Sequence, residues 1–158
     1  MIDSKRMVEV QEMDDKDSKK LLGRVGYGHL GLVRDSHPYV VPVHYAYDES
    51  HVYIFTTEGK KTEIIQRNPE VCLQVEDVTD EKHWQSVIVT GDAVQLTGKE
   101  EIKQAMDLIL ATNPRLTPAL SIHWMDQWVR ENVQVVYQIT PTIITGRTTV
   151  DRLKHQEG

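Results

Sequence analysis

Short runs of β-branched and aromatic residues, separated by turn sequences, fill the middle of the chain. In Tyr39–Tyr47 every second residue, starting from Tyr39, is a valine or a tyrosine, which predicts a strand with one buried face. The turn sequence Asp48-Glu49-Ser50 leads from it into a second run, His51–Thr56. With the shorter run His29–Val33 before them, these segments predict an antiparallel meander.

Four further segments have the composition of strands: Val71–Glu76, Ser86–Leu96, Val133–Ile139 and Thr142–Thr148. A polar loop is expected at 77–82, and Gly91 is expected to mark a β-bulge. Strands and helices do not alternate as they do in a parallel α/β sheet, so the sequence predicts a mainly β protein. About six strands in meander order favour a closed or nearly closed antiparallel barrel, which leaves no strand edge exposed.

Helical patterns are expected at four places: Asp14–Leu22, Glu58–Arg67, a segment from the capping sequence at Thr97 to Thr112, and Ser121–Arg130. The last of these would place Trp124 and Trp128 one turn apart, as a packing pair or as a platform for stacking a ring. No repeat or linker divides the chain, so a single domain, 1–158, is expected. It would have an N-terminal arm with one short strand at 1–13 and a polar tail at 151–158.

The composition limits the classes of partner. The chain has 18 Lys and Arg against 24 Asp and Glu, a net charge of −6, which argues against general binding of nucleic acids or anionic membranes. The single cysteine, Cys72, excludes an internal disulfide framework, and the seven histidines have none of the spacings of a metal site. The polar N-terminus and the lack of a long apolar run predict a cytoplasmic location.

The segment Thr56-Thr57-Glu58-Gly59-Lys60-Lys61 places hydroxyls at a strand end and two lysines in the first turn of the following helix. A helix N-terminus carries partial positive charge, so lysines there are unfavourably placed. A bound phosphate would make the arrangement favourable, because it would meet free backbone N–H groups, two hydroxyls and two ammonium groups. The alternative is that both lysines extend into water.

Pro42 interrupts the strongest predicted strand. It removes a backbone donor, so it is expected at a sheet edge or at a bulge. Such a break would free neighbouring backbone groups for a flat ligand, or it would protect an edge strand from aggregation. His44, two residues later, could touch such a ligand or could be a hydrogen-bonded strand histidine.

Five stretches together carry a resemblance to a known family: Gly28–Leu32, Pro38–Tyr45, Val52–Lys61, Ile64–Cys72 and Trp84–Gly91. In this order they resemble the FMN-binding split-barrel superfamily related to pyridoxamine 5′-phosphate oxidase, and within it the nitroimidazole-resistance-type flavoproteins. The resemblance extends from about Asp14 to Thr148. It implies a six-stranded antiparallel split barrel that forms a homodimer, with two FMN molecules at the subunit interface.

The resemblance also implies roles for individual residues. The strand Pro42, Val43, His44 and Tyr45 would lie along the isoalloxazine ring through its backbone. The phosphate would be held by the strand end and helix start, which contain Phe55, Thr56, Thr57, Lys60 and Lys61. Ser86 would contact the flavin, often from the other subunit. No catalytic acid, base or nucleophile is assigned.

Two departures from the family argue against two activities known in it, oxidation of pyridoxamine phosphate and reduction of nitroimidazoles. The oxidase ends in a segment with tryptophan and arginine that closes its vitamer site, whereas this chain continues through Ile143–Thr148 into a polar tail. Nitroimidazole-type members often carry a histidine near Thr56 or Thr57, and this chain has none there. The leading hypothesis is therefore a flavin-dependent oxidoreductase with an unknown small-molecule substrate. The alternatives are a non-catalytic flavin- or haem-binding protein and a structural dimer without a cofactor.

Overall fold

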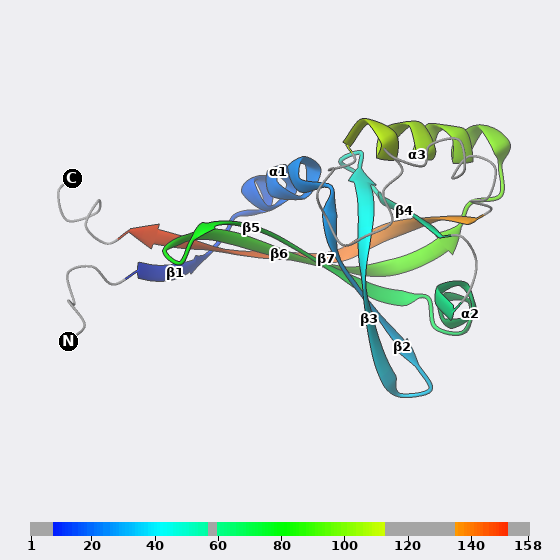
Figure 1. Ribbon diagram of the computed structural model, residues 1–158, viewed down its shortest axis with the longest axis horizontal. Helices are drawn as coiled ribbons and strands as arrows, with labels where there is room; N and C mark the ends of the chain where they lie inside the picture. Colours follow the sequence, from blue (N-terminus) through cyan, green and yellow to red (C-terminus); the bar gives the residue numbers. More distant parts are fainter. Residues whose placement is uncertain (1–7, 57–59, 113–134, 152–158) are drawn as a thin grey trace.

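The computed structural model describes residues 8–56, 60–112 and 135–151, and Figure 1 shows their arrangement. The elements in chain order are β1 (Val8–Glu12), α1 (Asp15–Val25), β2 (Tyr27–Arg34), β3 (His37–Tyr47), β4 (Val52–Thr56), α2 (Lys60–Arg67), β5 (Glu70–Asp80), β6 (His83–Gln95), α3 (Lys99–Thr112) and β7 (Val135–Asp151). The helix predicted at 121–130, with Trp124 and Trp128, lies outside the described residues. None of the described helices is both long and apolar enough to span a bilayer.

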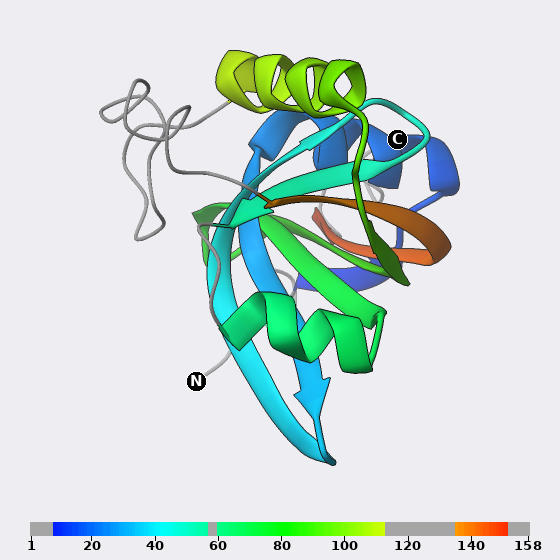
Figure 2. The ribbon, with the colours of Figure 1, turned by 90° about the vertical axis from the view of Figure 1, so that its right-hand side faces the viewer.

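Six of the strands close into a ring in the order β7-β4-β3-β2-β5-β6, and β6 pairs back with β7. All of these pairings are antiparallel, and Figure 2 shows the ring from a second direction. The short strand β1, in the predicted N-terminal arm, adds to β7 beyond the ring. The predicted six-stranded antiparallel barrel is therefore confirmed.

The two closing strands predicted at 133–139 and 142–148 are wrong as separate elements, because one strand, β7, runs through both. Thr90 of β6 lies opposite Ile143, whereas Gly91 lies opposite Pro141, so β7 carries one extra residue there. The bulge predicted at Gly91 is thus confirmed, with the extra residue on the partner strand. A bulge bends a strand without ending it, which is why the chain stays paired across this point.

Two other boundaries also differ from the sequence prediction. The polar loop expected at 77–82 shrinks to a tight turn, because β5 continues to Asp80 and β6 begins at His83. The polar residues there belong to an exposed hairpin, in which the Asp80 carboxylate accepts hydrogen bonds from the Lys82 N–H and the His83 ring at 2.8 Å. Helix α1 continues past Leu22 to Val25, and Gly26 ends it with a φ of 74°.

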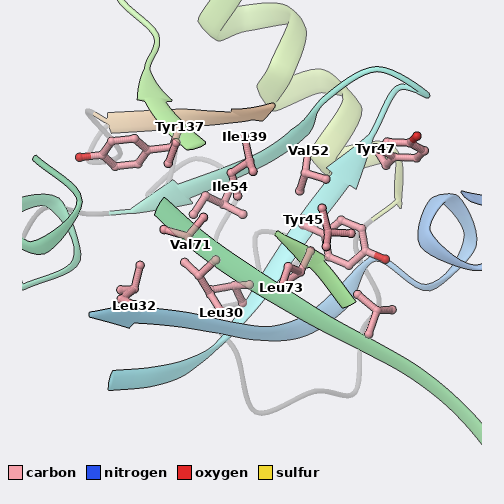
Figure 3. Close-up of a cluster of buried hydrophobic side chains, with 14 of the residues drawn as sticks. Leu30, Leu32, Tyr45, Tyr47, Val52, Ile54, Val71, Leu73, Tyr137 and Ile139 are labelled. Carbon is pink, nitrogen blue, oxygen red and sulfur yellow. The ribbon is translucent and has the colours of Figure 1, made fainter. Parts of the chain in front are cut away.

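The main core fills the inside of the barrel. Figure 3 shows part of it, including Leu30, Tyr45, Ile54, Leu73 and Ile139, which belong to β2, β3, β4, β5 and β7 and are each 1% exposed or less. Helix α2 adds Ile64 and Ile65 to this core, and α1 adds Leu21 and Leu22.

A second core lies on the outside of the barrel, where α3 covers β3, β4 and β7. It contains Ala46, Phe55, Leu96, Ala105, Met106, Ile109 and Val136. The second half of β3 and the strand β4 therefore contribute side chains to a core on each face. This packing holds in place the two strands that carry most of the predicted site residues.

A substitution at Gly91 tests how much the β6–β7 pairing that closes the barrel contributes to stability. A Cβ atom at this position would overlap the backbone carbonyl of Thr140, which cannot move without disturbing the β6–β7 pairing. We expect Gly91→Ala to lower the free energy of unfolding by about 2–4 kcal/mol in denaturant titrations. Gly23→Ala is the matched control, since a Cβ there would lie 3.9 Å from the Tyr47 ring, at ordinary contact distance, on an exposed part of the helix. This substitution should raise the free energy of unfolding by about 0.5–1 kcal/mol. Equal stability of the two variants would contradict the prediction.

Candidate functional site

The barrel is split where β4 leaves β3. The last residue pair between these strands is Tyr45 with Ile54. Beyond it, Phe55 and Thr56 of β4 pair only with β7, opposite Val136 and Val135. The part of β3 before Tyr45 therefore has β2 on one edge and no strand on the other among the described residues.

Backbone groups of alternate β3 residues face this open edge. The Tyr45 N–H donates to the Gly26 carbonyl at 3.1 Å, so Tyr45 and the other odd-numbered residues direct their backbone groups towards β2. The backbone groups of Val40, Pro42 and His44 consequently point to the other side. Pro42 lies opposite His29 in a regular register without a bulge. Of the two positions predicted for Pro42, the structure therefore shows the sheet edge.

The side chains of Val43 and Tyr45 belong to the main core. They are 4% and 0% exposed, and the Tyr45 hydroxyl donates to the Leu22 carbonyl at 2.5 Å. Burial raises the pKa of Tyr45 well above its usual value, so this side chain remains a neutral anchor. At these two positions the side chains face the core and the backbone groups face β2, so a ligand at the open edge would meet the backbone groups of their even-numbered neighbours instead.

His44 is also buried, at 2% exposed, but its side chain lies on the outer side of β3. Its imidazole is edge-on to the Tyr27 ring, with 6.1 Å between the ring centroids and an interplanar angle of 69°. His44 is therefore a buried strand histidine whose ring packs against Tyr27 of β2.

The predicted phosphate residues follow directly after the split. Phe55 is 6% exposed and packs under α3, and Thr56 ends β4. Lys60 and Lys61 open α2, where the helix dipole favours an anion. Thr57 lies outside the described residues. Because Ile64 and Ile65 anchor α2 in the main core, the helix start is held at this end of the barrel.

Ser86 is not part of this group within one chain. It lies on β6, and β2 and β5 separate β6 from β3 in the ring. The Ser86 hydroxyl accepts a hydrogen bond from the Gln74 side chain at 3.2 Å, and its neighbours in register are Glu76 and Arg147. The β3 and β4 residues thus flank the split and α2 follows β4 in the chain, whereas Ser86 lies on β6, with two strands between it and β3.

Three cavities among the described residues lie elsewhere. One of about 230 Å³ between β4 and α3 is lined by Tyr53, Asp48 and Glu101 among others, and it contains none of the predicted site residues. Tyr53 donates to Asp48 at 2.8 Å; burial, and then this bond, raise the pKa of Tyr53 to about 12. Two further cavities, of about 260 and 250 Å³, also lack the predicted residues. Among the described residues, the candidate site is an open strand edge.

Sequence reasoning overlooked three outward side chains on the strands that follow β3 in the ring: Tyr27 and His29 on β2, and Gln74 on β5. The sequence could have identified Tyr27 and His29 as outward-facing. Leu30 and Leu32 take the alternate positions of the same strand and face the core. Gln74 is recognisable only from the pairing of β5 with β2, where it lies opposite His29.

This edge, bounded by a lysine-bearing helix start on a closed six-stranded ring, defines the class of antiparallel split barrels. The family model described as pyridoxamine 5′-phosphate oxidase matches residues 14–148. The chain belongs to this pyridoxamine 5′-phosphate oxidase-like family.

Solved structures share this fold, and one curated protein is similar in sequence. A FAD-binding protein from Mesorhizobium loti is 26% identical, with a TM-score of 0.74 over 92% of this chain and 100% of the other. A proposed 5-nitroimidazole antibiotic resistance protein from Bacteroides thetaiotaomicron shares the fold at 22% identity, with a TM-score of 0.69 over 91% of this chain and 90% of the other. An uncharacterized protein from Rhizobium meliloti is 32% identical over 82 residues, which span 52% of this chain and about half, 54%, of that relative.

Proposed function

We propose that the protein binds FMN at the split between β3 and β4 and acts as a flavin-dependent oxidoreductase on a small molecule. The observation that carries this proposal is the departure of β4 from β3 after Tyr45 and Ile54. It leaves the backbone groups of Val40 and Pro42 directed to an edge without a strand partner among the described residues, and α2 follows β4 in the chain. Membership of the family and the likeness to a FAD-binding protein of nearly the same extent support a flavin as the ligand.

The residues present fit the two ends of FMN. Carbonyl and N–H groups along the β3 edge suit the polar rim of a flat heteroaromatic ring. Two lysines at a helix N-terminus suit a terminal phosphate, which carries close to two negative charges. This is the reason to propose FMN before FAD, whose phosphates are internal. When bound, a flavin supplies the two-electron chemistry, and the chain supplies binding, orientation and shielding from water.

A second copy of the chain is the partner that we propose. The outer face of β5, β6 and the second half of β7 carries exposed apolar side chains, with Ile88 45% and Ile143 58% exposed. Ser86 lies on this same face, and two strands, β2 and β5, separate it from β3 of its own chain. A contact between Ser86 and a flavin at that edge therefore favours a homodimer in which each subunit completes the site of the other.

Flavin binding without turnover is the second candidate. The β3 part of the site offers backbone groups, whereas the side chains of Val43 and Tyr45 are committed to the core. Such a site can hold a cofactor without supplying an acid or a base. The absorption spectrum of the purified protein separates the flavin proposals from haem binding, because only haem gives a Soret band.

The lysine pair tests the phosphate contact. We expect Lys60→Ala/Lys61→Ala to weaken FMN binding by about 2–4 kcal/mol, because two charge-assisted contacts are lost. Riboflavin, which has no phosphate, should bind weakly, and its affinity should be the same for the parent and for the variant. Calorimetric titration with FMN, FAD and riboflavin measures this, and Lys99→Ala/Lys103→Ala on α3 is the matched control. A double variant that holds FMN as tightly as the parent would overturn the phosphate assignment.

The edge proline tests the ring contact. Pro42→Ala restores a backbone donor and releases the fixed φ, so it should change the edge that the ring would contact. We expect FMN affinity to fall about threefold to tenfold, while thermal unfolding remains cooperative. Pro38→Ala is the control, since Pro38 faces the same edge near the tip of the hairpin, opposite Val33. An equal effect of both substitutions would argue that these prolines protect the edge and do not shape a site.

The dimer is tested by sedimentation. We expect the protein to sediment at twice the chain mass of 18.2 kDa, with or without added FMN. Ile88→Lys/Ile143→Lys should shift it to the monomer, because four charges would meet at an apolar interface of two copies. Val94→Lys, which changes an exposed valine elsewhere on β6, should leave the dimer intact. A monomeric parent at micromolar concentration would refute the proposal.

A further inference from the structure

The outer side of β2, next to the candidate site, carries two ring side chains that the proposed function has not used. Strand β2 alternates, so Leu30 and Leu32 are 0% and 2% exposed in the core, while Tyr27 and His29 face outward and are half-buried. Both belong to the stretch that precedes the β2–β3 hairpin.

The register places these side chains directly beside the candidate site. Tyr27 lies opposite His44, and His29 lies opposite Pro42. In both pairs the backbone groups point away from each other, because the odd-numbered residues of β3 make the bonds to β2. Such non-hydrogen-bonded pairs bring the side chains closest together. Any ligand that extends from the β3 edge across the outer face therefore meets Tyr27 and His29 next.

The rings hold one another in fixed orientations. The centroids of Tyr27 and His29 are 5.6 Å apart with an interplanar angle of 67°, so Tyr27 makes edge contacts to imidazoles on two strands. Within the described residues, neither the Tyr27 hydroxyl nor the His29 ring makes a side-chain hydrogen bond. In contrast, the rings of His37 and His83 each use Nδ1 for one. Tyr27 and His29 are thus ordered polar rings with unused hydrogen-bonding capacity.

A polar strip continues from these rings to Ser86. Gln74 lies opposite His29 on β5, and its amide donates to the Ser86 hydroxyl at 3.2 Å. The strip runs across four neighbouring strands, from His44 on β3 to Ser86 on β6. It therefore joins the two parts of the candidate site that are separated in the chain.

We propose that Tyr27 and His29 form a contact surface for the flavin ring, with His29 donating or accepting a hydrogen bond and Tyr27 fixing its imidazole. The proposal rests on the proposed function, and it adds side-chain recognition of the flavin ring, which the β3 edge would otherwise contact through backbone groups alone. Imidazole and phenol match the carbonyl oxygens and ring nitrogens of an isoalloxazine, and they offer aromatic surface to the same plane.

The test separates ring contacts from phosphate contacts by using two probes, FMN and lumiflavin, which is the ring system without the ribityl phosphate. We expect His29→Ala to weaken the binding of both probes about threefold to tenfold, and Tyr27→Leu to do the same. His29→Gln, which keeps a hydrogen-bonding group, should remain within about twofold of the parent. Lys60→Ala/Lys61→Ala should weaken FMN alone.

The matched control is His37→Ala, which removes an imidazole at the far end of the same hairpin and should not change either affinity. A second readout is the visible absorption and circular dichroism of bound FMN, whose band positions should move in His29→Ala. If the parent binds FMN and the His29 variants bind both probes equally tightly with unchanged spectra, the inference is wrong and the proposed function stands. If the parent binds neither probe, both are wrong. Thermal melts of each variant exclude loss of folding as the cause.

Discussion

Strand β7 pairs with β1 and β4 on one edge and with β6 on the other, and the rest of the architecture depends on this double pairing. Its 17 residues are long enough to meet all three strands, because the bulge opposite Gly91 bends the strand without breaking it. Since β7 holds β4 from the far side, β4 can leave β3 after Ile54 and still remain part of the barrel. The split and the closure of the ring are therefore two results of the same set of hydrogen bonds.

Sequence reasoning recovered the features that are local in origin. Alternation of apolar residues identified the strands of the meander, and the missing donor of Pro42 limited it to an edge or a bulge, of which the structure shows the edge. It failed where a polar or broken segment stays paired through long-range contacts, as at Thr140-Pro141-Thr142 in β7 and in the hairpin that follows Asp77. Tyr27, His29 and Gln74 were overlooked for a related reason: which side chains adjoin Pro42 and Ser86 depends on strand register, and register is not a local property.

The candidate site and the core share the same strand. Odd-numbered residues of β3 direct their side chains into the barrel and their backbone groups to β2, and even-numbered residues direct their backbone groups to the open edge. Val43 and Tyr45 are thus site residues by position and core residues by side chain. A substitution there acts first on packing, so a change in ligand affinity at either position would report the placement of the strand and not a lost side-chain contact.

This division also affects how fast such a protein can diverge. An edge that offers carbonyl and N–H groups keeps its chemistry whichever side chains the strand carries, provided that the core remains filled. Selection on a main-chain site would act on the placement of the strand and on the volume of its core side chains, and only weakly on which residues they are. Homologues could therefore keep the whole barrel while retaining about a quarter of their residues in common, as this chain and the Mesorhizobium loti protein do at 26% identity. In such a family, a polar side chain that stays the same at a position outside the core is a better guide to the activity of each member than the sequence of the strand that would hold the ring.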